Sequence, residues 1–274
     1  MATVIELVCY PIKGCAGVPL PEAVLTPAGL AHDRSFMVTD EDGVFRSQRR
    51  DPRLALIRAE VGVDGHWLTL RAPGAEDARI EVDLTGARRH VEMFGKPYPG
   101  IDQGDTVAAW LSEVLGAASR LVRTPPEYKR VTDGLTPGTA GFADGQALLV
   151  TSLSSLDLLN GRMLERGGEP LPMDRFRANV VVTGWPEPHT EDRARQMSIG
   201  ETELGYAKLA LRCAVTTVDQ QSGRKDGPEP LRTLADFRRV HGGVAFGAKF
   251  SVIRPGRLAV GDEVNVGSWG EPDL

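Results

Sequence analysis

The chain has 274 residues and a formal net charge of −5, with 41% apolar and 25% charged residues, which suits one large or two moderate globular domains. The acidic balance argues against a general nucleic-acid binder, and no apolar run approaches the roughly 18 residues that a membrane helix needs. Three cysteines are too few for a disulfide framework and the start "MATVIELVCYPIKG" has no secretory pattern, so we expect a cytoplasmic protein with reduced thiols.

The whole chain has 31 glycines and 19 prolines without a repeat period, which indicates many turns and a strand-rich fold. Its first part is predicted to consist mainly of strands. The expected strands and hairpins cover residues 3–10, 34–48, 54–73, 79–84 and 88–94. The first hairpin turns at Asp42-Gly43, and the second has Asp64-Gly65 as a two-residue turn. A helix is expected at 105–115, with Asp105 as its N-cap and Gly116 as its stop. Its apolar face comprises Val107, Leu111, Val114 and Leu115.

The second part is predicted to mix strands and helices. A linker is expected at 123–130, where Pro125 and Pro126 interrupt any pattern, and a glycine-rich loop at 133–146. The expected strands lie at 147–151 and 178–184, two more lie around 196–211, and the last lie near 244–253 and 263–267. The expected helices lie at 152–168, with Leu156, Leu159 and Met163 inward, and at 230–240.

The sequence lacks the motifs of several common cofactor and catalytic sites. No G-x-G-x-x-G opens a helix, and neither a phosphate loop nor a G-x-S-x-G motif is present. The histidines (His32, His66, His90, His189 and His241) lie far apart, and none has the helical spacing of a zinc pair. Three cysteines cannot supply four thiolates, so no iron–sulfur cluster is expected in this chain.

Cys213, in the stretch "LRCAVTTVDQQSG", allows two interpretations. A lone cysteine at a strand end is often a small buried hydrophobe. The neighbouring Arg212 would instead stabilise a thiolate, and a thiolate suits a metal that prefers sulfur. Thr216, Thr217 and Asp219 add polar groups at the same strand end. Both readings remain open on the residues alone.

A cationic site is indicated by two further clusters. In "DRFRANVVVTG", Arg175 and Arg177 precede a buried strand that begins near Asn179, and two guanidinium groups could clamp a phosphate or form surface salt bridges. Lys13 and Arg34 lie beside loops in which glycine lets backbone N–H groups approach a ligand.

The sequence resembles the MOSC family, named for the C-terminal domain of molybdenum cofactor sulfurase. The motifs that carry the resemblance occur in the family's order: "YPIKGCAGVPL", "GLAHDRSFMVTDEDGVFRSQRRDPRLALI", "GFADGQALLVTSLSSLDLLNGRM", "DRFRANVVVTG" and "LRCAVTTVDQQSG". It is especially similar to proteins that pair an N-terminal MOSC β-barrel with a MOSC domain, including the mitochondrial amidoxime reducing component. The resemblance covers about residues 4–267.

The resemblance implies a mixed, β-rich (α+β) fold, in which a MOSC N-terminal β-barrel domain (1–118) packs on a MOSC β-barrel domain (119–274) with peripheral helices. It implies a molybdenum cofactor (Mo-molybdopterin) whose metal is ligated by Cys213. The residues that match cofactor-binding positions are Lys13, Gly14, Arg34, Arg177, Asn179 and Arg212. Asp144 matches an acidic residue near the metal, with a proton-relay or substrate-positioning role, or it caps a loop. Pyridoxal phosphate binding is a label of the family and is not expected here.

The implied activity is two-electron reduction of an N-hydroxylated or N-oxide compound. Electrons would come from a separate ferredoxin- or cytochrome-type protein with its reductase, and Lys13 and Arg34 would favour an acidic donor. No nucleic-acid or membrane partner is expected. The alternatives are a sulfur or molybdenum-cofactor carrier that uses Cys213 as persulfide or transfer thiol, and a non-catalytic module that binds another anion. Gly14, Leu211 and Gln146 stand where the amidoxime-reducing relatives have serine, which affects the expected substrate preference.

Overall fold

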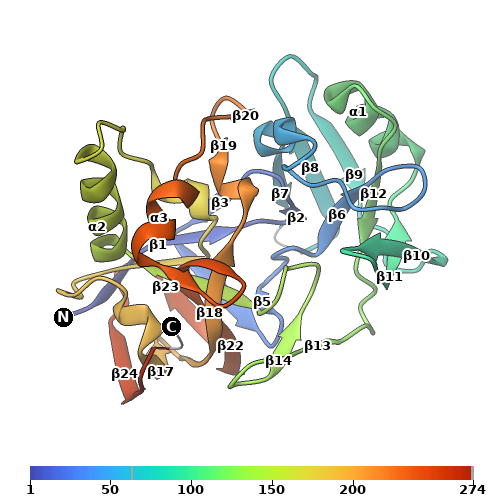
Figure 1. Cartoon of the computed structure of the whole chain (residues 1–274). Coiled ribbons are helices and arrows are strands. Elements are labelled where there is room, and N and C mark those ends of the chain that lie inside the picture. Colours follow the sequence, from blue (N-terminus) through green and yellow to red (C-terminus); the bar gives the residue numbers. More distant parts are fainter. Residues whose placement is uncertain (63, 273–274) are drawn as a thin grey trace.

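The computed structural model describes residues 1–62 and 64–272, and it confirms a mixed, strand-rich fold. Figure 1 shows two lobes: one carries α1 (Asp105–Leu115), and the other carries α2 (Leu153–Leu164) and α3 (Leu231–Phe237). Within the described residues, no helix is long and apolar enough to cross a membrane.

The larger lobe is built on a nine-stranded sheet. Its strands are β1 (Thr3–Cys9), β3 (Val18–Leu20), β15 (Leu148–Ser152), β16 (Val180–Thr183), β17 (Ala194–Ile199), β18 (Thr202–Arg212), β21 (Arg239–Val240), β22 (Gly243–Arg254) and β24 (Val264–Trp269). They follow the order β24-β17-β18-β22-β15-β16-β1-β3, and β21 pairs with β22. Strands β15 and β16 are parallel, and α2 makes the crossover between them, as parallel pairing requires.

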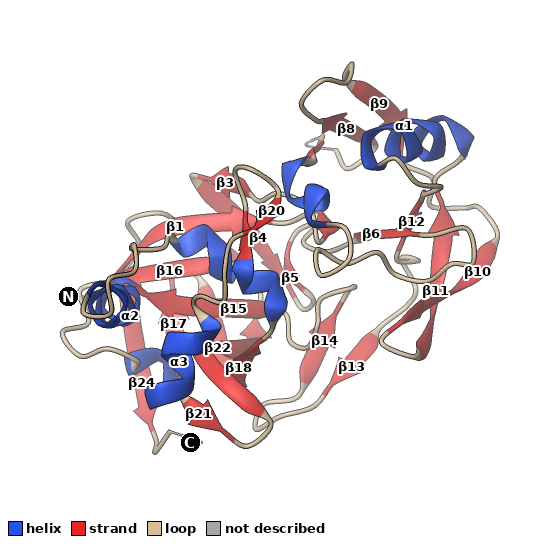
Figure 2. Ribbon diagram, turned by 45° about the horizontal axis from the view of Figure 1, so that its top comes forward, coloured by secondary structure: helices blue, strands red, loops and turns tan. Residues whose placement is uncertain are grey.

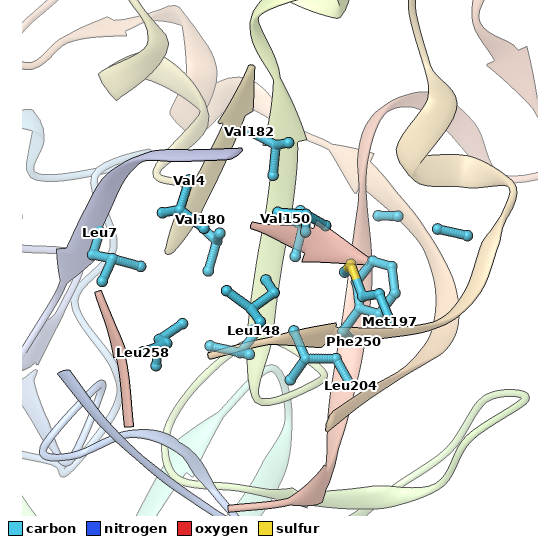
Figure 3. Close-up of a cluster of buried hydrophobic side chains, with 14 of the residues drawn as sticks. Val4, Leu7, Leu148, Val150, Val180, Val182, Met197, Leu204, Phe250 and Leu258 are labelled. Atoms are coloured by element: carbon cyan, nitrogen blue, oxygen red, sulfur yellow. The ribbon is translucent and has the colours of Figure 1, made fainter. Parts of the chain in front are cut away.

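Strand β15 is buried along its whole length because both faces of the sheet are covered. Leu148 and Val150 point into one core, which Figure 3 shows with Val180, Val182 and Phe250. Leu149, between them, belongs to a second core under α2 and α3. Figure 2 shows both helices on this side of the sheet. The alternation of strand side chains thus fills two cores, and it fixes the strand ends that carry the site.

The smaller lobe holds a five-stranded and a three-stranded sheet. The first contains, in spatial order, β10 (Arg88–Met93), β11 (Lys96–Asp102), β12 (Arg120–Arg123), β6 (Phe36–Thr39) and β2 (Ile12–Lys13). The second contains β7 (Arg58–Val61), β8 (Trp67–Arg71) and β9 (Ala78–Glu81). Helix α1 packs on their shared core through Val107, Leu111 and Leu115.

Strand pairing crosses the predicted domain division at residues 118/119 in both directions. Strand β1 pairs with β16 of the larger lobe, and β12 pairs with β6 of the smaller one. The short strands β4 (Glu22–Thr26) and β5 (Gly29–Leu30) form a sheet with β23 (Gly256–Ala259). Two hairpins complete the fold: β13 (Arg130–Thr132) with β14 (Gly138–Ala140), and β19 (Val218–Asp219) with β20 (Arg224–Lys225). The division itself stays a prediction.

The three predicted helices are confirmed with small changes at their ends. Helix α1 stops at Gly116, which is left-handed with φ 68°, but its N-cap is Gly104. Asp105 is the first helical residue, where its carboxylate receives a hydrogen bond from Arg120 at 2.8 Å. Helix α2 begins one residue later than predicted because Ser152 is its N-cap, accepting a hydrogen bond from the Ser155 N–H.

The predictions for turns were less accurate. The connection after β7 runs from Val61 to Trp67, so Asp64-Gly65 is not a two-residue turn; Val63, in that predicted hairpin, lies outside the described residues. The hairpin at Asp42-Gly43 has its turn, with Gly43 at φ 82°, but its second arm makes only isolated bridges. The predicted loop at 133–146 contains β14. Its partner β13 begins at Arg130, the last residue of the predicted linker.

Candidate functional site

A cleft between the two lobes gathers the residues that the sequence singled out. Its walls come from the β2 and β6 region of the smaller lobe, and from the ends of β15, β16 and β18 and the middle of β22 in the larger one. The predicted residues that line it are Lys13, Gly14, Arg34, Asp144, Arg177, Asn179, Arg212 and Cys213. A second cavity, behind Tyr10, is lined by none of them.

Lys13 ends β2 and is 5% exposed. Its ammonium forms an ion pair with Asp144 and lies 5.0 Å from the Phe45 ring centroid and 5.3 Å from that of Phe94. The next residue, Gly14, turns the chain with φ 83°, a conformation that favours glycine. Its carbonyl accepts a hydrogen bond from Gln48 at 2.7 Å, so this turn is anchored to the loop that follows β6.

Arg34 and Asn179 form one buried hydrogen-bonded unit. Arg34 donates to Asp33 at 2.5 Å, to the Asn179 side-chain oxygen at 2.8 Å and to the Arg177 carbonyl at 3.1 Å. The Asn179 amide group donates to the Val8 carbonyl at 3.0 Å and to Asp33 at 3.1 Å. Asn179 therefore holds β1, Arg34 and the start of β16 together, and its amide is largely used within the protein.

Arg177 stands where the 3-10 helix Met173–Phe176 ends, in the left-handed conformation with φ 56°. Its guanidinium lies 4.3 Å from the Tyr10 ring centroid, and that of Arg34 lies 4.4 Å from the same centroid. Arg177 donates to Gln220 at 3.3 Å, while its Nη2 is buried without a partner among the described residues. Burial lowers the pKa of Arg177. A buried donor without an acceptor is costly, which favours an anion from outside the chain.

Cys213 follows β18 and precedes the 3-10 helix Ala214–Thr217. It is a free, half-buried cysteine, and its carbonyl accepts a hydrogen bond from the Thr216 hydroxyl at 2.9 Å. Arg212, next to it, donates to the Phe176 carbonyl at 2.6 Å, but its Nε is buried without a partner among the described residues. Burial lowers the pKa of Arg212 to about 10. The thiol is thus accessible at the end of a rigid strand, beside a guanidinium.

Asp144 lies in the loop between β14 and β15. Arg130 holds this loop by donating to the carbonyls of Ala143 at 2.6 Å and Gly145 at 2.8 Å. Burial would raise the pKa of Asp144, but Lys13 outweighs it, and the pKa lies well below its ordinary value. The side chain is 56% exposed, so solvent screens part of this effect. Asp144 is therefore ionised at neutral pH.

Several cleft residues were not predicted from the sequence. Lys249, on β22, lines the cleft, and no hydrogen bond or ion pair of its ammonium occurs within residues 1–62 and 64–272. Gln48 bridges Gly14 and Gln220. Phe45, Arg49 and Phe94 lie on the smaller-lobe side of the cleft. Phe45, Gln48 and Arg49 lie in the second of the quoted motifs, but nothing in it singled them out, and Lys249 and Phe94 lie in no motif.

Arg175 does not join Arg177 in an anion clamp, which corrects that reading of "DRFRANVVVTG". Arg175 is 2% exposed and does not line the cleft. It forms ion pairs with Asp226 at 2.7 Å and Asp219 at 3.3 Å. The left-handed turn at Arg177 sends the two side chains to different surroundings, so Arg175 fastens the 3-10 helix Met173–Phe176 to the β19–β20 hairpin.

The residues that line the cleft suit an anionic cofactor whose metal is bound by a cysteine sulfur of the protein. The lining residues include the cations Lys13, Arg34, Arg49, Arg177, Arg212 and Lys249, and Asp144 is the acidic residue among them. The buried donors on Arg177 and Arg212 lack acceptors within the described residues. Guanidinium groups match phosphate oxygens, and the Cys213 thiol offers a soft metal ligand.

Comparison with known proteins agrees with the motifs. Residues 1–118 match the MOSC N-terminal beta barrel domain, and residues 137–265 match the MOSC domain. The chain is 34% identical to mitochondrial amidoxime reducing component 2 of Rattus norvegicus, over 96% of this chain and 83% of the relative. It is 31% identical to molybdenum cofactor sulfurase of Danio rerio, over 89% of this chain but only 31% of that protein.

Among solved structures, the YUAD protein from Bacillus subtilis matches with a TM-score of 0.44 and 14% identity, over 96% of this chain and 94% of that one. The family models together match most of the chain, and the rat relative exceeds 30% identity over nearly all of it. The chain therefore belongs to the MOSC family, with the family's N-terminal β-barrel domain preceding its MOSC domain.

Proposed function

We propose that the chain is a molybdenum-cofactor-dependent oxidoreductase that reduces N-hydroxylated and N-oxide compounds, with electrons from a separate donor protein. The observation that carries the proposal is the half-buried Cys213 thiol in a cleft whose Arg177 and Arg212 guanidinium groups hold buried donors without acceptors among the described residues. The similarity to amidoxime reducing components supports the same reaction class. A cytoplasmic location also remains a proposal.

Each site residue has a distinct task in this proposal. Cys213 is the protein ligand of the metal, and the bound cofactor would supply the two-electron redox chemistry. Arg177 and Arg212 bind the anionic part of the cofactor through their free donors, while Lys13, Gly14, Arg34 and Asn179 shape that wall. Asn179 acts mainly by holding Arg34 at 2.8 Å. Asp144, ionised and paired with Lys13, positions the substrate by accepting a hydrogen bond from its N–H or O–H group.

The test compares two cysteine variants of protein expressed in a host that makes the cofactor. Cys213→Ala is expected to abolish reduction of an N-hydroxylated amidine driven by reduced viologen, with an unchanged circular dichroism spectrum. Cys9→Ala is the matched control, because Cys9 is buried in the core of the larger lobe and does not line the cleft. Parental turnover by Cys213→Ala would exclude Cys213 as the functional ligand.

A carrier function is the second candidate, and the similarity to molybdenum cofactor sulfurase favours it. In that case Cys213 would hold a persulfide or pass the cofactor on. Metal and sulfur analysis separates the two functions. About one molybdenum per chain together with turnover supports the reductase, whereas metal-free protein that releases labile sulfur from Cys213 supports the carrier.

A further inference from the structure

Reduction of an N–O bond needs protons as well as electrons. For a hydroxylamine the balance is R–NH–OH + 2 e⁻ + 2 H⁺ → R–NH₂ + H₂O, with both electrons from the donor protein. The oxygen leaves as water, so a protonated group beside it would accelerate N–O cleavage by general acid catalysis. The residues that line the cleft limit which group can act in this way.

Asp144 and Lys13 are poorly suited to give up a proton. Asp144 is ionised at neutral pH, because Lys13 lowers its pKa well below the ordinary value and outweighs the effect of burial. The ammonium of Lys13 is held in the ion pair with that carboxylate. The arginines of the cleft keep their protons at neutral pH, since even Arg212, whose pKa burial lowers to about 10, stays charged there.

Lys249 differs from these groups in its surroundings. It points from β22 into the cleft, and its ammonium has no ion-pair or hydrogen-bond partner within the described residues. A Cβ atom on Gly145 would lie only 2.9 Å from its Nζ, so the ammonium rests against the loop that carries Asp144. It is therefore near the carboxylate that positions the substrate in the proposed function.

Charged side chains from several neighbouring elements influence the pKa of Lys249. Burial lowers its pKa to about 8; Asp144 opposes the shift, and Arg212, Lys208 and Lys13 add to it. On the adjacent β18, Lys208 lies directly across from Lys249 but pairs with Asp133 at 2.5 Å. An ammonium in such surroundings is mostly protonated at neutral pH and can release its proton readily.

We propose that Lys249 is the general acid of this site, which donates a proton to the oxygen that leaves the substrate nitrogen. This role rests on the proposed reductase function. The donor protein supplies the electrons, and solvent returns the proton to Lys249 after each turnover. Asp144 orients the substrate, and Lys249, whose ammonium lies beside Gly145 of the same loop, protonates the departing oxygen.

The test is the pH profile of kcat for N-hydroxylated amidine reduction with reduced viologen. The parental rate is expected to be level below about pH 8 and to fall above it, as the Lys249 ammonium loses its proton. Lys249→Met is expected to lose roughly 100-fold in kcat, the lower end for a general acid, with unchanged molybdenum content. Lys249→Arg keeps the charge but not the titration, so it should not restore the rate.

The matched control is Lys208→Met, which removes the facing ammonium outside the cleft. Because Lys208 adds to the lowering of the Lys249 pKa, this variant should keep the parental kcat below about pH 8 and move the fall in rate to higher pH. A second measurement is independent of turnover. NMR of ¹³Cε-lysine protein should show one resonance that titrates near pH 8 and that is absent from the Lys249→Met spectrum.

The outcomes separate the two proposals. A parental chain that carries molybdenum but reduces no N-hydroxylated or N-oxide substrate overturns the reductase function and the role of Lys249 with it. An active parent with an unchanged Lys249→Met profile, or with full rescue by Lys249→Arg, overturns only the general acid. A loss of bound molybdenum in Lys249→Met would instead make Lys249 a cofactor anchor.

Discussion

Arg177 and Arg175 are two residues apart in the sequence but have different surroundings, so the same substitution should have different effects. Arg177→Ala removes a guanidinium whose buried Nη2 lacks a partner among the described residues. Its loss should weaken cofactor retention by the value of a charge-assisted bond, about 1.5–3 kcal/mol, or about ten- to a hundredfold in affinity. Molybdopterin content after gel filtration measures this effect.

Arg175→Ala is the control for that experiment. Arg175 is buried and paired with Asp219 and Asp226, so its loss should lower the melting temperature while bound cofactor per folded chain stays the same. The opposite pattern, with the melting temperature lowered only in Arg177→Ala and cofactor content lowered only in Arg175→Ala, would reverse the two assignments.

At the scale of single elements, the sequence predicts best where periodicity and capping agree. Helix α1 has an apolar face and a terminal glycine, and α2 has the Ser152 cap, so both were predictable. The two-residue strands β2 and β5 have no period to detect, because their pairing is set by the rest of the fold. Strand β11 was hidden by Pro97 and Pro99, which usually argue against a strand.

The prolines of β11 are tolerated for a geometric reason. Residues two apart in a strand direct their backbone nitrogens to the same side, so Pro97 and Pro99 lack N–H groups on one edge only. Strand β10 pairs with β11 from Lys96 to Ile101, whereas β12 pairs only at Ile101 and Asp102, beyond the prolines. The prolines thus occupy an unpaired stretch of edge, which the sequence alone does not reveal.

The site shows the same limits. The resemblance placed Cys213, Arg177 and Arg34 in one family pattern, and the fold brings them to one cleft, while their roles stay predictions. Lys249 was missed because a lone lysine in a strand is usually a solvated residue. Only the register of β22 against β15, which pairs Lys249 with Leu149, turns its side chain toward the cleft.

The segment that packs beneath α3 should make stability depend on pH. His189 precedes the 3-10 helix Thr190–Asp192 with φ 60°, and its ring lies 6.0 Å from the ring centroid of Phe237 and 6.2 Å from that of Phe246. Burial, aided by Arg238 and Arg162, lowers its pKa from 6.5 to about 3. Below pH 6.5 the unfolded chain therefore binds a proton that the folded chain does not, and stability falls toward about pH 3.

His189→Asn tests this effect, because asparagine tolerates the left-handed backbone and does not titrate. The difference in unfolding free energy between parent and variant should shift in favour of the variant between pH 6.5 and about 3. The shift should not exceed about 1.4 kcal/mol per pH unit. Urea unfolding at several pH values measures it, and a pH-independent difference would show that His189 is already charged in the folded protein.

At the scale of the whole molecule, the two lobes exchange strands, and the cleft needs both. The chain passes from β1 of the larger lobe to β2 of the smaller lobe, and Lys13 and Gly14 lie at the end of β2. Arg34 lies in the connection from β5, which packs with the larger lobe, to β6 of the smaller lobe. The site residues are therefore held where the chain passes between lobes, and separating the lobes would dismantle the cleft.

The charge distribution also bears on how electrons reach the site. The chain has a net charge of −5, but its cleft is cationic. Lys13 is buried and Arg34 is mostly buried, and they are paired with Asp144 and Asp33, so they are poorly placed to attract a donor protein, contrary to the expectation from sequence. Arg49 is exposed, lines the cleft and lies 5.5 Å from the Phe94 ring centroid, so we expect it to be the cation that an acidic donor would contact.

Turnover should therefore depend on the kind of donor. Reduced viologen needs no docking surface and should drive the parental chain at rates that vary little with salt. NADH alone should not drive turnover, since no dinucleotide fingerprint is present.

With reduced ferredoxin and its reductase, the rate should fall as salt rises, because electrostatic steering is screened. Arg49→Glu should slow only the ferredoxin reaction, and Arg257→Glu, an equal charge change at an exposed position of β23 that does not line the cleft, should not. Equal slowing by both variants would show that net charge, rather than the cleft, governs docking, and turnover with NADH alone would reveal a further cofactor site.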